Sequence, residues 1–293
     1  MKITVMGQGA WGQALAQVAR NAGHNVALWS RSSASMQKCD AVIIAVPAQA
    51  LRHVLPFVNA PIIISAAKGI ERDTGLTMAE VVRAAVPTHE FYALSGPSFA
   101  SDVLAGLPTA ITLAGSDLNS TTKLATALSL PTFRIYASDD VIGVELGGAL
   151  KNVLAIACGV ADGRGLGESA RASLTTRGFA ELSRFAQARG AKPETLMGLS
   201  GLGDLLLTCS STKSRNYSFG LALGKGQSAE MALAYSTGVV EGAATARIAA
   251  SLAATHHVDM PIINAVTALI DGTLKPDDVI AKLLARPVGV ENK

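Results

Sequence analysis

Six short apolar runs, separated by stretches with helical spacing of apolar residues, dominate the first part of the chain. The runs lie at Ile3–Met6, Val26–Trp29, Ala41–Ala45, Ile62–Ser65, Phe91–Leu94 and Ala110–Ala114. Several are apolar at every position, as expected for parallel strands that are buried on both faces. Strands that alternate with helical stretches in this way predict a doubly wound, parallel α/β sheet.

The pattern changes after Ser138 to long stretches rich in Ala, Leu and Gly, with few β-branched runs. Helix starts are indicated at Asp139–Asp140, Pro193, Ser228 and Pro276. We therefore expect two domains, a sheet domain over residues 1–140 and an all-helical domain over residues 141–293.

Composition excludes several classes of protein. The net charge is +3 and the 25 basic residues are scattered, which argues against a nucleic-acid surface and suits a small anionic ligand. Cys39, Cys158 and Cys209 lie far apart without a C-x-x-C pair, so we expect a reducing, cytoplasmic compartment and no metal site. No signal-peptide pattern is present, and the longest uncharged run, residues 53–67, is interrupted by two prolines, so we expect no membrane span.

Three glycines follow the first apolar run in the spacing G-x-G-x-x-G, at Gly7, Gly9 and Gly12. In such a turn the first glycine permits a tight bend, the second admits a phosphate, and the third lets the helix pack on the strand. The helix that follows points its free N–H groups at the pyrophosphate. The position between strand and helix predicts a Rossmann-type dinucleotide site, with Ala10 and Trp11 beside the cofactor.

The end of the second strand indicates which dinucleotide binds. An NAD site usually carries Asp or Glu there for the ribose 2′-OH, whereas this chain reads Trp29-Ser30-Arg31-Ser32. A guanidinium flanked by hydroxyls suits a 2′-phosphate. We therefore expect NADP(H) to be preferred, with Arg31 on the 2′-phosphate, and NAD(H) to be accepted.

Six further segments carry residues suited to chemistry. They are Ala66–Glu71 (AAKGIE), Ser95–Ala100 (SGPSFA), Glu145–Val153 (ELGGALKNV), Gly198–Asp204 (GLSGLGD), Thr208–Asn216 and Gly238–Gly242. With the leading glycines, this ordered set closely resembles the bacterial-type NAD(P)-dependent glycerol-3-phosphate dehydrogenases from Met1 to about Asp278. The resemblance implies interconversion of sn-glycerol 3-phosphate and dihydroxyacetone phosphate, which supplies glycerol phosphate for phospholipid synthesis.

Two departures from that family stand out. Its members usually carry a helix and an edge strand after the second strand, but here nine residues, Ser32–Asp40, separate Arg31 from the next run. Nine extended residues reach roughly 30 Å, enough to step about 10 Å across one strand and return along about 17 Å. We therefore expect the edge strand to be missing and the adenosine pocket to be more open. The second departure is Ser169, where relatives commonly have Asn and where we expect only a packing effect.

Oxidation of a secondary alcohol needs a group that takes the hydroxyl proton. None of the five histidines lies in the shared segments, and a lysine can serve if burial and a neighbouring cation lower its pKa. Lys151 lies in an otherwise apolar helix, and the resemblance names it as the proton acceptor. Lys68 follows a strand at its carboxyl end and resembles the second substrate lysine, also in contact with the cofactor. The resemblance puts Asp204 beside Lys151.

The resemblance also assigns the remaining candidates. Ser214, Arg215 and Asn216 offer a hydroxyl, a guanidinium fork and an amide, which suit a phosphate. The substrate candidates besides these are Gly96, Ser98, Asn152 and Thr208, and the cofactor candidates are Ala100, Val239 and Glu241, with Arg215 also close to the cofactor.

Two alternatives remain open from the sequence. A dehydrogenase for a β-hydroxyacid would also pair a dinucleotide domain with a helical one and use a lysine, but it would not need the Ser214-Arg215-Asn216 triplet. A cofactor-binding sensor without turnover would be expected to lack Lys151 or Asp204, and both are present. The sequence does not give the oligomeric state, and a homodimer is one option.

Overall fold

The computed structural model describes residues 1–30, 32, 35–288 and 290, and within this part the strands form one mixed sheet of order β2-β1-β3-β4-β5-β6-β7. The strands are β1 (Lys2–Met6), β2 (Asn25–Trp29), β3 (Ala41–Ile44), β4 (Ile62–Ser65), β5 (Glu90–Ser95), β6 (Thr109–Gly115) and β7 (Phe133–Ser138). All six predicted strands are present, with ends that differ by at most one residue. Strand β2 is an edge of the sheet among the described residues, in agreement with the prediction that no strand lies beyond it.

The predicted parallel sheet is confirmed except at one pair of strands. Strands β1 to β5 are parallel, whereas β6 runs antiparallel to β5. The connection of residues 96–108 holds only the short helix α4 (Ala100–Leu104). It leaves the chain at the carboxyl end of β5, so β6 starts there and runs back. Strand β7, which was not predicted, pairs in parallel with β6.

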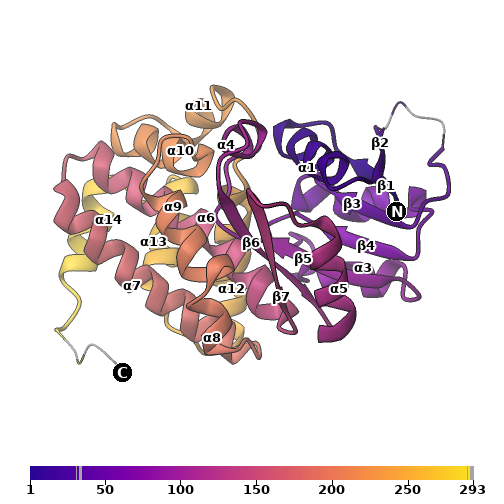
Figure 1. The fold of residues 1–293 in the computed structure, drawn as a ribbon. Helices are drawn as coiled ribbons and strands as arrows, with labels where there is room; N and C mark the ends of the chain where they lie inside the picture. Colours follow the sequence, from indigo (N-terminus) through magenta and orange to yellow (C-terminus); the bar gives the residue numbers. More distant parts are fainter. Residues whose placement is uncertain (31, 33–34, 289, 291–293) are drawn as a thin grey trace.

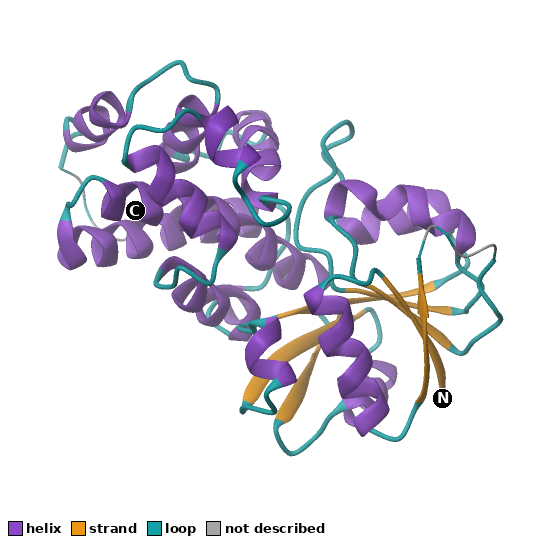
Figure 2. Ribbon diagram, turned by 90° about the horizontal axis from the view of Figure 1, so that it is seen from above, coloured by secondary structure: helices purple, strands orange, loops and turns teal. Residues whose placement is uncertain are grey.

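Helices cover both faces of the sheet (Figure 2). One face packs on α1 (Ala10–Asn21), α4 and α5 (Leu118–Leu128), and the other packs on η1 (Ala48–Ala50), α2 (Leu51–Val54), η2 (Leu55–Phe57) and α3 (Met78–Ala85). Side chains of β1 alternate between the two clusters, with Ile3 and Val5 in the first and Met6 in the second. This is the layered arrangement of a doubly wound fold.

A helical half lies beside the sheet (Figure 1). Its elements are α6 (Val141–Gly163), α7 (Gly167–Ala188), α8 (Pro193–Leu196), the π-helical turn η3 (Leu199–Gly203), α9 (Asp204–Cys209), α10 (Arg215–Gly224), α11 (Ala229–Ala234), α12 (Glu241–Thr255), α13 (Pro261–Ile270) and α14 (Pro276–Leu284). The predicted starts at Asp140, Pro193, Ser228 and Pro276 are confirmed. Asp140 caps α6 by accepting a hydrogen bond of 2.8 Å from the Gly143 N–H.

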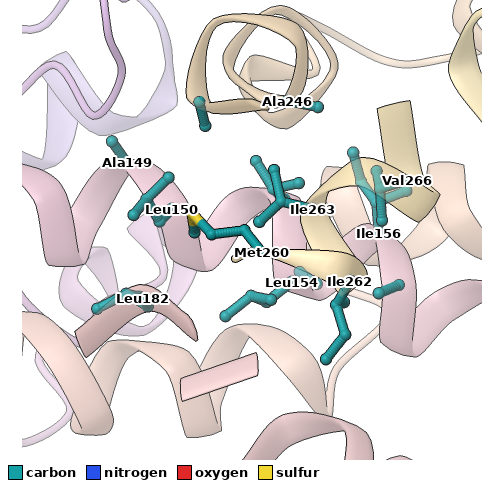
Figure 3. Close-up of a cluster of buried hydrophobic side chains, with 14 of the residues drawn as sticks. Ala149, Leu150, Leu154, Ile156, Leu182, Ala246, Met260, Ile262, Ile263 and Val266 are labelled. Carbon is teal, nitrogen blue, oxygen red and sulfur yellow. The ribbon is translucent and has the colours of Figure 1, made fainter. Parts of the chain in front are cut away.

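Helix α6 forms the centre of this half. Leu150, Leu154 and Ile156 are buried against Ile263 and Val266 of α13 and other apolar side chains (Figure 3). By length and mean hydropathy α6 could cross a bilayer, but 89% of its most apolar window is buried inside the protein. A helix that is apolar all round is also what the centre of a helical core requires.

Helices α6 and α10 touch along their main chains. A Cβ atom on Gly163 would lie 2.5 Å from the Leu221 carbonyl oxygen, and Cβ atoms on Gly159 and Gly220 would likewise overlap backbone atoms of the opposite helix. Only glycine permits this approach. The contact places the first residues of α10 beside the middle of α6.

Candidate active site

The glycine turn has the geometry that its sequence predicts. Gly7 has a φ of +108°, and a Cβ there would lie 2.6 Å from the Ala45 carbonyl oxygen. Gly12 packs directly on the Gly7 backbone. A Cβ on Gly9, by contrast, would meet no atom within 4 Å, so the start of α1 faces open space. No side chain caps α1, which leaves its first N–H groups for a phosphate.

Trp11 and Ala10 occupy the first turn of α1. The Ala10 side chain is exposed, and Trp11 is half-buried against the cluster below α1. The residues present at this turn therefore fit the pyrophosphate of a dinucleotide.

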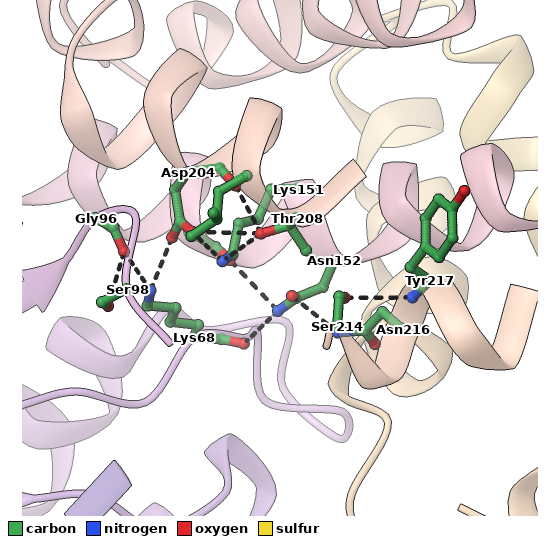
Figure 4. A network of polar contacts seen from close by, with 12 residues as sticks. Lys68, Gly96, Ser98, Lys151, Asn152, Asp204, Thr208, Ser214, Asn216 and Tyr217 are labelled. Carbon is green, nitrogen blue, oxygen red and sulfur yellow. Dashed lines mark hydrogen bonds and ion pairs between the residues drawn. The ribbon is translucent and has the colours of Figure 1, made fainter. Parts of the chain in front are cut away.

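Three charged side chains meet between the two halves of the molecule (Figure 4). Lys151 comes from α6, Asp204 from the start of α9, and Lys68 from the segment after β4. The carboxylate of Asp204 accepts from both amines: Lys68 Nζ lies 2.7 Å from one oxygen, and Lys151 Nζ bonds the other. Lys151 also donates to Thr208 Oγ1 at 2.9 Å. The contact of Asp204 with Lys151 is the one that the family resemblance implied.

Burial and charge tune this cluster. Lys151 is only 6% exposed and Asp204 is fully buried. Burial is the main cause that lowers the pKa of Lys151 to about 8, the Asp204 carboxylate opposes the change, and the Lys68 ammonium adds to it. An amine with this pKa exchanges a proton near neutral pH, as a general acid or base must.

A fixed carbonyl group holds Lys68 from the other side. The Gly96 carbonyl oxygen accepts from Lys68 Nζ at 3.1 Å and from Ser98 Oγ at 3.1 Å. Gly96 has a φ of +145°, and a Cβ there would lie 2.7 Å from the Ile111 Cα. The Gly96 carbonyl is therefore the group that this predicted substrate residue aims at the cluster. Ala100 begins α4 four residues later.

The start of α10 lies next to Lys151. Asn216 donates to Asn152 Oδ1 at 2.9 Å and accepts from the Gly242 N–H at 2.9 Å. Asn152, the neighbour of Lys151, donates to the Lys68 carbonyl at 3.4 Å. Ser214 caps the helix by accepting from the Tyr217 N–H at 3.3 Å. Asn216 of the predicted triplet and the lysine pair are therefore parts of one polar network (Figure 4).

Arg215 points toward the segment that precedes α12. It is exposed, and its guanidinium lies against Gly238, near Glu241. Glu241 bridges the two halves, because its Oε1 accepts from the Ala48 N–H at 3.0 Å. Burial raises the pKa of Glu241 above its ordinary value. Val239 and Glu241 line a cavity of about 860 Å³ that also contacts Pro47 and Ala50 on the sheet side.

One predicted cofactor residue, Arg31, lies outside the described residues. The strand before it ends at Trp29, whose indole is buried and packs against the Phe57 ring at an interplanar angle of 38°, with ring centroids 5.2 Å apart. The three cysteines are free and buried. Among the described residues, no three His, Cys, Asp or Glu side chains are grouped as a metal ion would require.

Glu145, which lies on α6 and is buried, is a residue for which the sequence predicted no role. Its Oε1 accepts from the Ala79 N–H at 2.8 Å, so it joins α6 to the start of α3 across the two halves. Burial raises the pKa of Glu145 to about 7. An acid in an otherwise apolar helix is the signal that could have identified it.

The glycine turn lies at the end of the first parallel strand, and the helical half beside it carries a buried lysine and aspartate. This combination defines a nicotinamide-dependent dehydrogenase. Family models described as NAD-dependent glycerol-3-phosphate dehydrogenase match both halves: the N-terminal model covers residues 2–40 and 32–121, and the C-terminal model covers residues 140–281. The chain belongs to this family.

Individual relatives agree with the family models. The chain is 48% identical to a glycerol-3-phosphate dehydrogenase [NAD(P)+] of Brucella ovis, over 99% of both chains. It is 46% identical to that of Parvibaculum lavamentivorans, over 98% of this chain and 97% of the relative. A crystal structure of glycerol-3-phosphate dehydrogenase from Coxiella burnetii is 35% identical and superimposes with a TM-score of 0.90, over 97% of this chain and 99% of that one.

Proposed function

We propose that the chain is an NAD(P)-dependent glycerol-3-phosphate dehydrogenase that interconverts dihydroxyacetone phosphate and sn-glycerol 3-phosphate for phospholipid synthesis. The observation that carries this proposal is the Lys151–Asp204–Lys68 cluster, which lies between a glycine turn fit for a dinucleotide and a helix start fit for a phosphate. In this proposal residues 1–140 form the dinucleotide domain, and residues 141–293 form the helical domain that supplies the catalytic lysine.

Lys151 is the general base for alcohol oxidation. Its neutral amine accepts the proton of the C2 hydroxyl as the hydride leaves C2, and the resulting ammonium returns the proton to the C2 oxygen in the reverse reaction. When bound, the nicotinamide supplies or takes the hydride. Asp204 orients the amine and stabilises the ammonium, while Lys68 keeps the pKa low enough for the neutral form. Closure of the two halves around the substrate would exclude water.

The other polar residues hold the two ligands. Ser214, Arg215 and Asn216 bind the substrate phosphate, since a guanidinium fork and a helix N-terminus both favour this anion. Substrate contacts also come from Lys68, Gly96, Ser98, Asn152 and Thr208. The cofactor lies on Gly7, Gly9, Ala10, Trp11 and Gly12 and reaches Lys68, Ala100, Arg215, Val239 and Glu241.

Two finer points complete the proposal. NADP(H) is the preferred cofactor and NAD(H) is accepted, with Arg31 on the 2′-phosphate. Free, buried cysteines support a reducing cytoplasmic location.

The test follows the loss of reduced-nicotinamide absorbance with dihydroxyacetone phosphate, using NADPH and NADH in parallel. We expect turnover with both and a higher kcat/KM with NADPH. Lys151→Ala should abolish turnover and leave NADPH binding nearly unchanged, because the amine lies in the helical half and not at the glycine turn. Lys282→Ala, on the exposed face of α14, is the matched control and should keep full activity.

Activity of Lys151→Ala equal to that of the control would remove this lysine from the mechanism. Reduction of a 3-oxo acid but not of the phosphorylated ketone would replace the proposal by a β-hydroxyacid dehydrogenase.

A further inference from the structure

A turn of the chain holds Lys213 directly before the triplet that begins α10. The Ser214 N–H donates to the Ser211 carbonyl at 3.0 Å, and the Lys213 N–H donates to Ser211 Oγ at 3.2 Å. Ser218 of α10 donates its hydroxyl to the Thr212 carbonyl at 2.8 Å. Because the turn is bonded both within itself and to α10, the Lys213 backbone has a fixed position relative to the triplet.

The Lys213 side chain reaches the sheet half of the molecule. Its Nζ donates to Asp102 Oδ1 of α4 at 2.9 Å and lies 5.7 Å from the centre of the Phe99 ring. An ammonium at this distance from an aromatic face makes a cation–π contact. The hydrogen bond from Lys213 also lowers the pKa of Asp102 below its ordinary value. One side chain of the helical half therefore binds two side chains of the sheet half.

Helix α4 gives this contact a firm base. Val103 of α4 is buried in the cluster that also holds Leu15 and Ala16 of α1. Helix α1 is the one whose uncapped start fits the pyrophosphate. The Lys213 contact therefore connects the triplet to a helix that packs on the dinucleotide side of the protein.

The contact lies between two groups of candidate substrate residues that come from opposite halves. Phe99 directly follows Ser98, and Lys213 directly precedes Ser214. The Lys213 side chain is 59% exposed and that of Asp102 is 31% exposed, and exposed ion pairs contribute little to the stability of a fold. The contact is therefore better placed to set the distance between the Ser98 and Ser214 segments than to hold the fold together.

We propose that Lys213 is a positioning residue for the substrate. Its contact with Asp102 and Phe99 holds the triplet at the distance from the segment after β5 that one phosphorylated substrate spans. This inference rests on the proposed function. Without the contact the start of α10 still forms, because the Ser214 side chain caps it. Substrate binding would then have to order the two segments, and this ordering costs affinity.

The contact acts on substrate binding and leaves the chemical step unchanged. The Lys151 amine is held by Asp204 and Thr208, and Lys213 takes no part in that cluster. Loss of the Lys213 contact should therefore raise the KM for the substrate and leave kcat as it is.

The split between KM and kcat tests this role. Lys213→Met keeps most of the aliphatic stem and removes the charge. We expect the KM for dihydroxyacetone phosphate to rise about three- to tenfold, which is what an exposed ion pair and a cation–π contact together account for. The kcat and the Kd for NADPH should stay within about twofold of the wild type. Lys213→Arg keeps the charge and can stack on an aromatic ring, so its KM should stay within about twofold of the wild-type value. An unchanged KM in Lys213→Met, or an equally high KM in both variants, would overturn the inference.

Asp102→Asn separates this role from a direct attraction between the Lys213 ammonium and the substrate phosphate. Positioning predicts a higher KM in Asp102→Asn. It also predicts that the double variant has a KM no higher than that of Lys213→Met alone, because both substitutions break one contact. Direct attraction predicts a lower KM in Asp102→Asn, since a carboxylate that opposes the lysine charge is removed. An unchanged or lower KM in Asp102→Asn would therefore contradict the positioning role.

Lys192→Met is the matched control. Lys192 Nζ lies 2.7 Å from Asp139 Oδ2, and both side chains are about half exposed. The substitution removes the same charge from the same type of ion pair, but neither residue adjoins a candidate substrate residue in the chain. Its KM should equal that of the wild type. A rise as large as that in Lys213→Met would show that loss of any surface charge raises KM, and the role of the Lys213 contact would be ruled out.

Binding of sn-glycerol 3-phosphate to the NADPH complex gives a readout without turnover, because both ligands are already reduced. Isothermal titration should give a Kd about three- to tenfold higher in Lys213→Met than in the wild type. A wild-type protein that shows this difference but does not reduce dihydroxyacetone phosphate would refute the proposed function and leave the positioning role standing. Equal affinities, or binding to neither protein, would refute the positioning role.

Discussion

The buried carboxyl group of Glu145 predicts a pH-dependent stability that one substitution removes. Glu145 lies where α6 meets the start of α3, and its Oε1 accepts the Ala79 N–H at 2.8 Å. Burial raises its pKa from 4.5 to about 7. Glu145→Gln keeps a carbonyl oxygen for the same hydrogen bond and remains neutral at every pH, so it reproduces the protonated acid.

The sign of the effect follows from the direction of the shift. A carboxyl group whose pKa is higher in the folded state contributes stability that is complete below the unfolded pKa of 4.5 and is lost as the pH rises through about 7. The shift corresponds to about 3 kcal/mol of unfolding free energy. We therefore expect Glu145→Gln to match the wild type near pH 4.5 and to be more stable by about 3 kcal/mol at pH 8.

Urea unfolding between pH 5 and 8 would measure this difference. Burial also raises the pKa of Glu181 to about 7, but that residue is present in both proteins and its contribution cancels. Glu230→Gln makes the same chemical change on an exposed side chain and serves as the control. A stability difference between wild type and Glu145→Gln that stays constant over this range would refute the reasoning.

Two further predictions concern the catalytic cluster. Because a neutral Lys151 must accept the proton, kcat/KM for glycerol 3-phosphate oxidation should rise with pH up to about 8 and then level off. The kcat/KM for dihydroxyacetone phosphate reduction should fall above about pH 8, because that direction needs the ammonium form. Profiles of kcat/KM against pH in both directions check this, and flat profiles would contradict it. In Gly147→Ala the new Cβ would lie 2.7 Å from the Ser200 carbonyl oxygen of η3, so the turn that precedes Asp204 must shift. We expect a loss of about 1–3 kcal/mol in stability, measured by urea unfolding, and a lower kcat with an unchanged Kd for NADPH, measured by titration. An unaltered kcat would show that η3 does not position Asp204.

Local sequence signals were sufficient for much of this molecule. The glycine turn could be predicted because each glycine has a separate physical task, and the structure shows a tight bend at Gly7 and open space at Gly9. The approach of Lys68, Lys151 and Asp204 could be expected only through the family resemblance. They come from segments separated by 83 and 53 residues, and no local pattern encodes such a contact.

Other features depended on tertiary context. Strand β7 reads Phe-Arg-Ile-Tyr-Ala-Ser, with exposed Arg134 and Tyr136, so its apolar pattern is weak. It is defined by pairing with β6, which itself runs antiparallel to β5. The role of Glu145 depends on a helix start that lies 66 residues earlier in the chain.

The glycine-mediated contact of α6 with α10 has a consequence for substrate choice. Lys151 lies on one of these helices and the Ser214-Arg215-Asn216 triplet begins the other, so the spacing between amine and phosphate cradle depends on how closely two backbones approach. The distance between the two main chains is fixed, because no side chain lies between them at these glycines. If the Lys151 amine and the triplet bind one molecule, the fixed distance between the two helices selects substrates by the number of carbons between the phosphate and the reacting oxygen.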